Sequence, residues 1–287
     1  MNTKNKQKVI AIAAPTASGK TAYAIELAKE IDGEIISADS RIIYKGFDIV
    51  CAKPTKEERQ GIPHYMIDIV EPEIDYSVAN YIDDATVAIN TILDKNKTPI
   101  IVGGTGLYFR ALLEGWNLPR VAPNYELRNE LEEINLEGLL EQLKILDEKT
   151  YEQMIIEPKK RKIIRAIEVC KALGEAMSNY ENQKETPYEV EWIGIGMTRE
   201  QLYERVNKRV DLMIEMGAVQ ETKNLLEKHG RIKNLISTIG YSEIIQYLDK
   251  EITLERAVEL IKQHSRNYAK RQLTWFRKNA NLDYKDK

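Results

Sequence analysis

The residues with the clearest chemical meaning lie near the N-terminus, between positions 9 and 30. An apolar run at 9–14 ends at Ala14, and helix-forming residues occupy 22–30. Between them lies the segment Pro15-Thr16-Ala17-Ser18-Gly19-Lys20-Thr21. This order of strand, loop and helix matches a phosphate-binding loop, or P-loop, with Ala14 where Gly is commoner. The alternative is a chance loop between a strand and a helix.

The types and order of these loop residues predict how an anion would be held. Backbone N–H groups around 17–20 are expected to converge on phosphate at the N-terminus of the helix. Lys20 would neutralise phosphate oxygens, and the hydroxyl of Thr21 would reach Mg²⁺. The loop therefore predicts a site for a di- or triphosphate without indicating which one.

Two further segments follow expected strands at positions where ligands bind. Asp39 and Ser40 follow the apolar run at 33–38, and Gly103-Gly104-Thr105-Gly106 follows the buried strand expected at 99–102. Because ligands bind at the carboxyl edge of an open parallel sheet, both segments should face the same crevice as the P-loop. The glycines would let the backbone approach a ligand closely, and Thr105 would offer a hydroxyl. The alternatives are that Asp39 caps a following helix and that the glycines form a tight turn.

Composition restricts the class of protein. The chain has 287 residues, of which 43% are hydrophobic, and a formal net charge of −3. It can bury a full core, and it carries no globally basic surface for nucleic acid, so such a site must be a local patch. Cys51 and Cys170 are too few for a disulfide framework or a zinc site. No run reaches membrane-spanning length, and we expect a cytoplasmic protein with no membrane contact.

The periodicity of apolar residues predicts an α/β fold with two additions. Strands are expected at 9–14, 33–38, 61–68, 99–102 and 189–197, and helices begin after Ser77 and Thr198. The acidic helical stretch at 126–157 and the basic helix start at 158–168 indicate an inserted all-helical subdomain. We therefore expect a first core segment at 1–115, an insertion at 116–188, and a last core strand with C-terminal helices at 189–287.

Besides the helix start at 158–168, basic residues gather on two of the expected helices. Arg205 and Arg209 share one face of the helix at 199–213, and the helix at 254–278 is basic along its second half. Its aromatic residues Tyr268, Trp275 and Phe276 alternate with the basic ones, a pattern that suits phosphate contact and base stacking. Such basic residues are otherwise simply solvated, and aromatic residues at helical spacing are often core.

These motifs together resemble the bacterial tRNA dimethylallyltransferase family, and the resemblance covers nearly the whole chain. The motifs are Ala14-Pro15-Thr16-Ala17-Ser18-Gly19-Lys20-Thr21, Ala38-Asp39-Ser40, Tyr44-Lys45-Gly46-Phe47-Asp48-Ile49, Ala52-Lys53-Pro54, Gly61-Ile62-Pro63-His64, Gly103-Gly104-Thr105-Gly106-Leu107-Tyr108 and 268–276. The chain departs from the usual pattern at Arg41 and Ile42 (Met and Gln), at Val50-Cys51 (Gly-Thr) and at Lys162 (Arg).

The resemblance implies a P-loop kinase-like fold in which the loop holds the pyrophosphate of dimethylallyl diphosphate. It implies that Asp39 takes a proton from the exocyclic amine of the adenosine beside the anticodon, at position 37. Thr105 would steady the reacting groups, and Arg209 would help to neutralise the leaving group. Mg²⁺ is the implied cofactor.

The resemblance also implies a tRNA-binding surface with the target base flipped into the crevice. Its residues would be Asp39, Ser40, Arg41, Ile42, Thr105, Arg128, Arg161, Lys162, Ile163, Ile164, Arg165, Lys270, Arg271 and Gln272. The last three of these would line the anticodon stem-loop.

Two other functions remain open from the sequence. A transferase that prenylates free AMP, ADP or ATP has the same chemistry, but it would give no role to an insertion or a basic C-terminal helix. A P-loop kinase for small molecules would share only the loop. We expect a monomer without an obligate protein partner.

Overall fold

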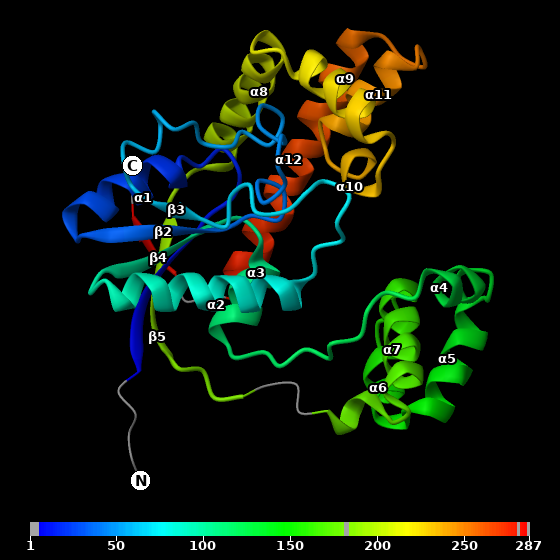
Figure 1. Ribbon diagram of the computed structural model, residues 1–287. Coiled ribbons are helices and arrows are strands. Elements are labelled where there is room, and N and C mark those ends of the chain that lie inside the picture. The colour runs from blue at the N-terminus through cyan, green and yellow to red at the C-terminus, as the bar shows by residue number, and fades with distance from the viewer. Residues whose placement is uncertain (1–5, 181–183, 280–281, 286–287) are drawn as a thin grey trace. The chain divides into compact units, whose positions relative to one another are not determined.

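The computed structural model describes residues 6–180, 184–279 and 282–285, and they form two compact units. Residues up to Leu113 and from Thr186 onwards belong to the first unit, and Glu114–Glu185 form the second. Figure 1 shows the elements of each unit. Within the described residues, no helix combines the length and apolarity needed to cross a membrane.

A parallel sheet forms the centre of the first unit. Its strands lie in the order β3-β2-β4-β1-β5-β6, and every pairing is parallel. Their bounds are β1 (Gln7–Ala13), β2 (Gly33–Ala38), β3 (His64–Tyr65), β4 (Thr98–Gly103), β5 (Tyr188–Ile195) and β6 (Asp283–Lys285). The five expected strands are confirmed, although β3 is shorter than the predicted range at 61–68. The short edge strand β6 was not predicted.

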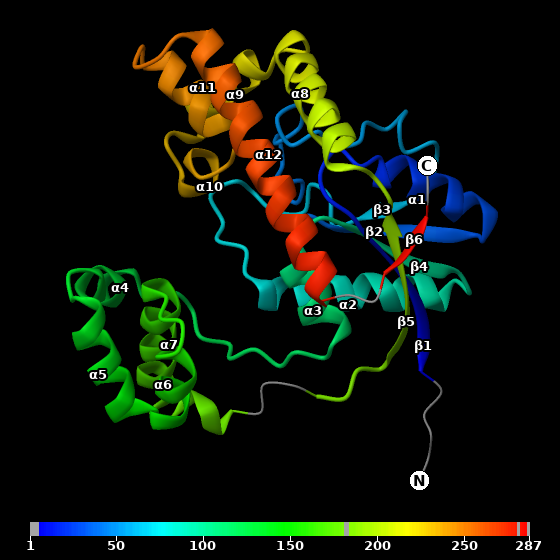
Figure 2. The same ribbon diagram turned by 180° about the vertical axis from the view of Figure 1, so that it is seen from behind.

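Helices cover both faces of this sheet, as Figures 1 and 2 show from opposite sides. Neighbouring strand residues point to opposite faces: Ile35 packs toward α1 (Lys20–Glu30), and Ile36 packs toward α2 (Val78–Asp94) and α3 (Gly106–Leu113). Ser77 caps α2 through a capping box, as predicted. The α/β class and the kinase-like layering are therefore confirmed.

The C-terminal part of the first unit is helical. It comprises α8 (Arg199–Glu215), α9 (Ala218–His229), α10 (Lys233–Ile236), α11 (Tyr241–Leu248) and α12 (Leu254–Asn279). Thr198 caps α8, as predicted. These helices enclose a second apolar core with the chain segment that follows β2, including the fully buried Phe47 and Tyr241. This core fixes that segment beside the carboxyl edge of the sheet.

The second unit is all-helical. Its helices are α4 (Tyr125–Glu132), α5 (Leu136–Leu146), α6 (Glu148–Met154), α7 (Lys160–Leu173) and the 3₁₀ turn η1 (Met177–Asn179). The acidic stretch at 126–157 is thus three short helices, because Asn135 and Asp147 each cap a new helix. Leu139, Leu143 and Ile167 are fully buried among them.

Candidate active site

The P-loop connects β1 to α1 in the form that the sequence predicts. Ala17 and Gly19 have φ angles of 62° and 85°, in the left-handed region, which turns the chain sharply before Lys20 begins the helix. The first N–H groups of a helix have no carbonyl partner within it, so they are free to face an anion. Among the buried side-chain atoms of the described residues, the hydroxyl of Ser18 is one of two without a hydrogen-bond partner. A bound phosphate oxygen would satisfy it.

A hollow that opens to solvent lies beside the loop. Its walls include Thr16, Lys20, Thr21, Asp39 and Arg209. The structure therefore brings together the predicted phosphate-binding residues and the predicted base. The apolar lining residues of the hollow include Ala24, Ile35, Ile42, Ile67 and Val102.

Lys20 is the principal cation of this hollow. Its Nζ donates to the carbonyl oxygen of Pro15 at 3.3 Å. Burial lowers the pKa of Lys20 to about 8, an effect that Asp39 opposes and Arg209 reinforces. Burial removes water from around the Lys20 ammonium. A bound anion would therefore stabilise the charged form of this side chain.

Arg209 is hydrogen-bonded to the P-loop residue Thr16. Its guanidinium donates to the Thr16 hydroxyl at 2.7 Å and to the carbonyl oxygen of Cys51 at 3.2 Å, and burial lowers its pKa. Because both of these donors bind protein oxygens, Arg209 fixes Thr16 while adding positive charge close to Lys20.

The predicted base lies on a turn that does not lead into a helix. Asp39 accepts a hydrogen bond from the backbone N–H of Arg41 at 2.8 Å, and no helix follows before Ser77 in this fully described stretch. The helix-cap alternative for Asp39 is therefore wrong. The Thr105 hydroxyl accepts from the backbone N–H of Ser40 at 3.2 Å, which ties the two strand-end loops together.

Tyr268 is a contact of this site that the sequence did not identify. Its hydroxyl shares a hydrogen bond with Thr105, and burial raises its pKa to about 12. It comes from α12, a helix whose basic and aromatic residues were expected to contact RNA. The alternation of aromatic and basic residues gave a signal, but it did not show which aromatic side chain would face inward.

The glycine cluster is closely packed against other parts of the protein. A Cβ atom at Gly103 would overlap the backbone of Ala38, one at Gly104 would overlap the side-chain amide of Gln272, and one at Gly106 would overlap the indole of Trp275. These glycines let strands and helix α12 pack closely, and Gly103 also lines the hollow beside the P-loop, so a close approach of this backbone to a ligand stays a prediction.

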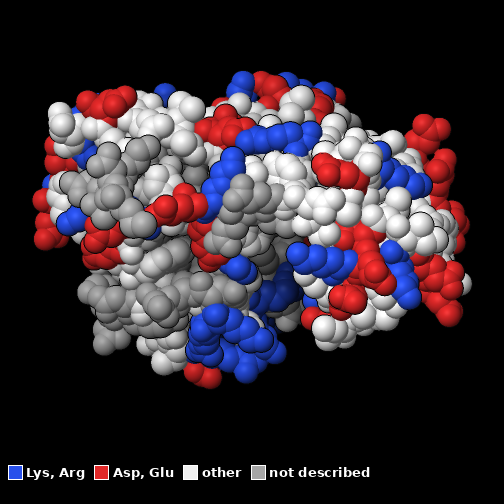
Figure 3. All heavy atoms as spheres, turned by 90° about the horizontal axis from the view of Figure 1, so that it is seen from below, with Lys and Arg blue, Asp and Glu red and all other residues white. Residues whose placement is uncertain are grey.

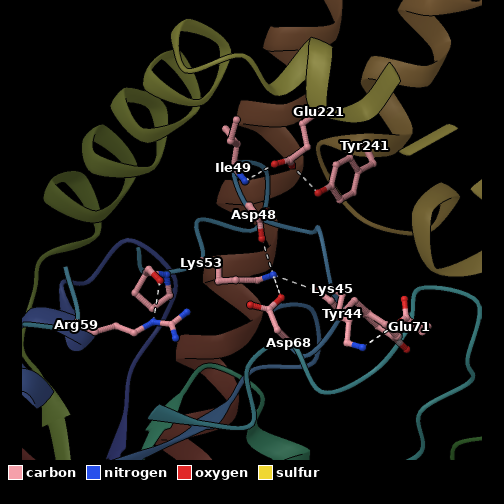
Figure 4. A network of polar contacts seen from close by, with 11 residues as sticks. Tyr44, Lys45, Asp48, Ile49, Lys53, Arg59, Asp68, Glu71, Glu221 and Tyr241 are labelled. Carbon is pink, nitrogen blue, oxygen red and sulfur yellow. Dashed lines mark hydrogen bonds and ion pairs between the residues drawn. The ribbon is translucent and has the colours of Figure 1, made fainter. Parts of the chain in front are cut away.

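One wall of the hollow is held by a polar network that includes a buried lysine (Figure 4). Lys53, whose side chain is 4% exposed, donates to Asp48 at 2.6 Å, to Asp68 and to the carbonyl oxygen of Tyr44. Glu221 accepts from the backbone N–H groups of Ile49 and Val50 and from the hydroxyl of Tyr241. The wall residues that follow, Cys51, Ala52 and Pro54, are thereby fixed. Only the family resemblance had marked Lys53, and Glu221 carried no signal.

The oxygen donors of the hollow fit Mg²⁺. Thr21 and Asp39 line the same space, and Mg²⁺ is commonly held by one or two protein oxygens together with phosphate and water. The described residues contain no group of three or more His, Cys, Asp or Glu side chains arranged for a metal. A Mg²⁺ ion here would therefore take most of its ligands from a diphosphate and from water.

Several residues predicted to contact tRNA serve the helical unit itself. Ile163 and Ile164 are 0% and 3% exposed and belong to its apolar core, so the prediction of RNA contact is wrong for these side chains. Arg128 and Arg165 both pair with Glu168, a carboxylate with 1% exposure. The hydrogen bonds of these two arginines hold the pKa of Glu168 below its ordinary value even though burial alone would raise it.

Other predicted tRNA contacts remain accessible. Arg161 and Lys162 are exposed at the start of α7, and Lys270 and Arg271 are exposed on α12, with Arg271 lying over the ring of Tyr268. The face shown in Figure 3 carries both acidic and basic side chains, with one dense group of basic ones. Gln272 is buried and bonded within the protein, so its predicted place on the anticodon stem-loop is wrong.

Known proteins share this sequence and fold. A family profile described as IPP transferase matches residues 42–279. The tRNA dimethylallyltransferase of Halalkalibacterium halodurans is 41% identical over 289 residues, covering 98% of this chain and 91% of that protein. That of Alkaliphilus oremlandii is 44% identical over 291 residues, covering 97% and 91%.

Solved structures agree with these matches. The full-length tRNA isopentenylpyrophosphate transferase from Bacillus halodurans has a TM-score of 0.74 at 41% identity, covering 98% of this chain and 90% of that chain. A eukaryotic dimethylallyltransferase acting on tRNA has a TM-score of 0.82 at 27% identity, covering 98% and 74%. The resemblance inferred from the motifs is confirmed, and the chain belongs to the IPP transferase family.

Proposed function

We propose that this protein transfers the dimethylallyl group of dimethylallyl diphosphate to the exocyclic amine of adenosine 37 in tRNA. The observation that carries the proposal is that Lys20, on the phosphate-binding loop, and Asp39, on a strand end, line one hollow. The charged and hydroxyl side chains of its lining suit a diphosphate, and its apolar lining residues suit a five-carbon prenyl chain. Relatives named tRNA dimethylallyltransferase cover almost the whole chain, which supports the same reaction.

The reaction places separate demands on these residues. A bond forms between the adenine nitrogen and the first prenyl carbon, while the bond from that carbon to the diphosphate oxygen breaks. Lys20, the loop N–H groups and the Ser18 hydroxyl bind the departing diphosphate, and Arg209 keeps the loop in place. Asp39 accepts the proton that the amine loses, and Thr105 holds the turn on which Asp39 lies.

Mg²⁺, bound by Thr21 and the diphosphate, would supply additional positive charge to the leaving group. Of the loop residues, Ala14, Pro15, Ala17 and Gly19 act through their backbone shape, whereas Thr16 is also held by Arg209 through its hydroxyl. The kinase-like loop thus serves to bind a leaving group, and no transfer of phosphate is required.

The RNA surface that we propose combines three accessible groups. Ser40 and Arg41 lie next to Asp39, where a flipped base would enter. Arg161 and Lys162 on the helical unit, together with Lys270 and Arg271 on α12, would bind the phosphate backbone. Arg128 and Arg165 shape the helical unit through Glu168. We further propose a cytoplasmic monomer, as befits an enzyme that acts on tRNA.

Four incubations separate this function from its alternatives. Purified protein with Mg²⁺ and labelled dimethylallyl diphosphate is given unmodified tRNA, AMP or ATP, and a fourth sample receives ATP alone. We expect label in tRNA, at the nucleoside of position 37 after digestion. Label in AMP or ATP with none in tRNA would identify a free-nucleotide prenyltransferase. Hydrolysis of ATP to ADP and phosphate without any prenylation would point to the kinase alternative.

A further inference from the structure

Gln272 joins two loops that lie far apart in the sequence. Its side-chain oxygen accepts a hydrogen bond from the backbone N–H of Thr16 at 2.9 Å, and its side-chain nitrogen donates to the carbonyl oxygen of Gly104 at 2.9 Å. Both ends of the amide are therefore used, and the residue is 6% exposed. No shorter polar side chain on the same backbone could reach both partners.

The surroundings of Gln272 are shaped to admit it. A Cβ atom at Gly104 would overlap its amide nitrogen, and a Cβ atom at Gly106 would overlap the neighbouring Trp275. On the other side, Thr16 is fixed by Arg209 from α8. Helices α8 and α12, which pack against each other, thus hold the same P-loop residue through its side chain and its backbone.

The second loop leads directly to the reacting groups. Gly104 precedes Thr105, whose backbone N–H donates to the carbonyl oxygen of Ala38 and whose hydroxyl accepts from the N–H of Ser40. Asp39 lies between these two contacts. A continuous set of hydrogen bonds therefore runs from Thr16 through Gln272 to the turn that carries Asp39.

We propose that Gln272 is a positioning residue that sets the distance between the diphosphate loop and the loop that carries Thr105. The proposal rests on the proposed function in assigning the P-loop to diphosphate. Gln272 would act on catalysis through Thr16 and Gly104 and would touch neither substrate. Its position next to the exposed Lys270 and Arg271 also gives α12 two distinct faces, one for RNA and one for the loop.

Two substitutions disturb this contact from opposite sides. Gln272→Met keeps the length of the side chain and removes both hydrogen bonds, and Gly104→Ala pushes the Gln272 amide away without altering α12. Gln263→Met is the matched control, because Gln263 is an exposed glutamine on the same helix. Pyrophosphate binding with Mg²⁺ is measured by calorimetry in the absence of RNA, together with tRNA affinity and the single-turnover rate of prenyl transfer.

We expect both variants to bind pyrophosphate about tenfold more weakly, because two buried hydrogen bonds that order the loop are lost. The single-turnover rate should fall by a similar factor at saturating substrates, while tRNA affinity and the control stay within about twofold of wild type. Unchanged pyrophosphate affinity would overturn the proposal, as would a loss confined to tRNA affinity. Lower thermal stability with normal pyrophosphate binding would likewise show a merely structural role.

The pyrophosphate measurement also tests the role of Gln272 separately from the proposed prenylation of tRNA. It requires neither RNA nor turnover, so it reports on Gln272 even if the wild-type protein fails to prenylate tRNA. Failure of wild-type prenylation with a tenfold binding defect in both variants would reject the proposed acceptor and retain the role of Gln272.

Discussion

The buried ammonium of Lys20 should destabilise the ligand-free protein. Burial, opposed by Asp39, lowers the pKa of this lysine from 10.5 to about 8. One pKa unit corresponds to about 1.4 kcal/mol, so keeping the ammonium charged costs the ligand-free fold roughly 2–4 kcal/mol at neutral pH. The unfolded chain binds the proton more tightly, and the cost is therefore relieved only as the pH rises from about 8 towards 10.5.

Lys20→Met removes the charge and keeps most of the length of the side chain. We predict that the free energy of unfolding of the ligand-free protein rises by about 1–3 kcal/mol at pH 7, as measured by urea denaturation. Prenyl transfer should fall at the same time by on the order of a hundredfold, because the leaving group loses its main cation. The variant would thus be more stable and nearly inactive.

Lys29→Met on the same helix is the control. Lys29 forms an exposed pair with Glu26, so its removal should change stability by no more than about 0.5 kcal/mol. A Lys20→Met protein that unfolds at a lower urea concentration than wild type would refute this reasoning. It would mean that the ammonium stabilises the empty loop.

Three further predictions concern pH, the helical unit and RNA. Pyrophosphate affinity should decline as the pH rises above about 8, because Lys20 then releases its proton. Pyrophosphate gains negative charge over the same range, which would by itself strengthen binding to a cationic site. A decline measured by calorimetry from pH 7 to 9 would therefore come from the protein. Glu168→Gln should lower the free energy of unfolding of Glu114–Glu185 by about 1–3 kcal/mol in urea denaturation, because two partly exposed arginines lose their buried partner. The pKa of Glu168 is lowered in the fold, so its contribution is present above the ordinary value of 4.5 and is lost as the pH falls through the lowered value. Arg271→Ala should reduce the salt dependence of tRNA binding by about one unit of slope.

Each of these three measurements has an outcome that would contradict the prediction. Pyrophosphate affinity that is constant or rising between pH 7 and 9 would contradict the role of Lys20. Equal stability of Glu168→Gln and wild type at pH 7 would show that the arginine pairs contribute nothing to the helical unit. An unchanged salt slope for Arg271→Ala would return that residue to an ordinary solvated helix face.

Local sequence patterns were sufficient to predict five of the six strands, the P-loop and the caps at Ser77 and Thr198. In the P-loop, a strand, a turn and a helix follow one another within about twenty residues, so the contacts that define it are local. Ser77 and Thr198 were likewise identified from the first turn of their own helices. The hollow followed from a topological rule, since Asp39 and Thr105 both come at the ends of parallel strands.

Contacts between distant residues were beyond the reach of these patterns. Basic residues on a helix look alike whether they bind RNA or a buried carboxylate, and only the fold shows that Arg128 meets Glu168, 40 residues away. Gln272 is separated by 256 residues from Thr16, its partner in the P-loop. The glycines at 103–106 gave a correct signal of close approach, but the sequence could not say that the approaching group is protein.

The central claim is that Asp39 accepts the proton of the adenine amine, and Asp39→Asn tests it most directly. The substitution keeps the shape of the side chain and removes its charge. With labelled dimethylallyl diphosphate and unmodified tRNA at saturation, the account predicts a single-turnover transfer rate lowered by on the order of a hundredfold or more, with both substrates still bound. If a higher Mg²⁺ concentration alone restored the transfer rate of Asp39→Asn to that of wild type, the result would contradict the account and assign Asp39 to the metal.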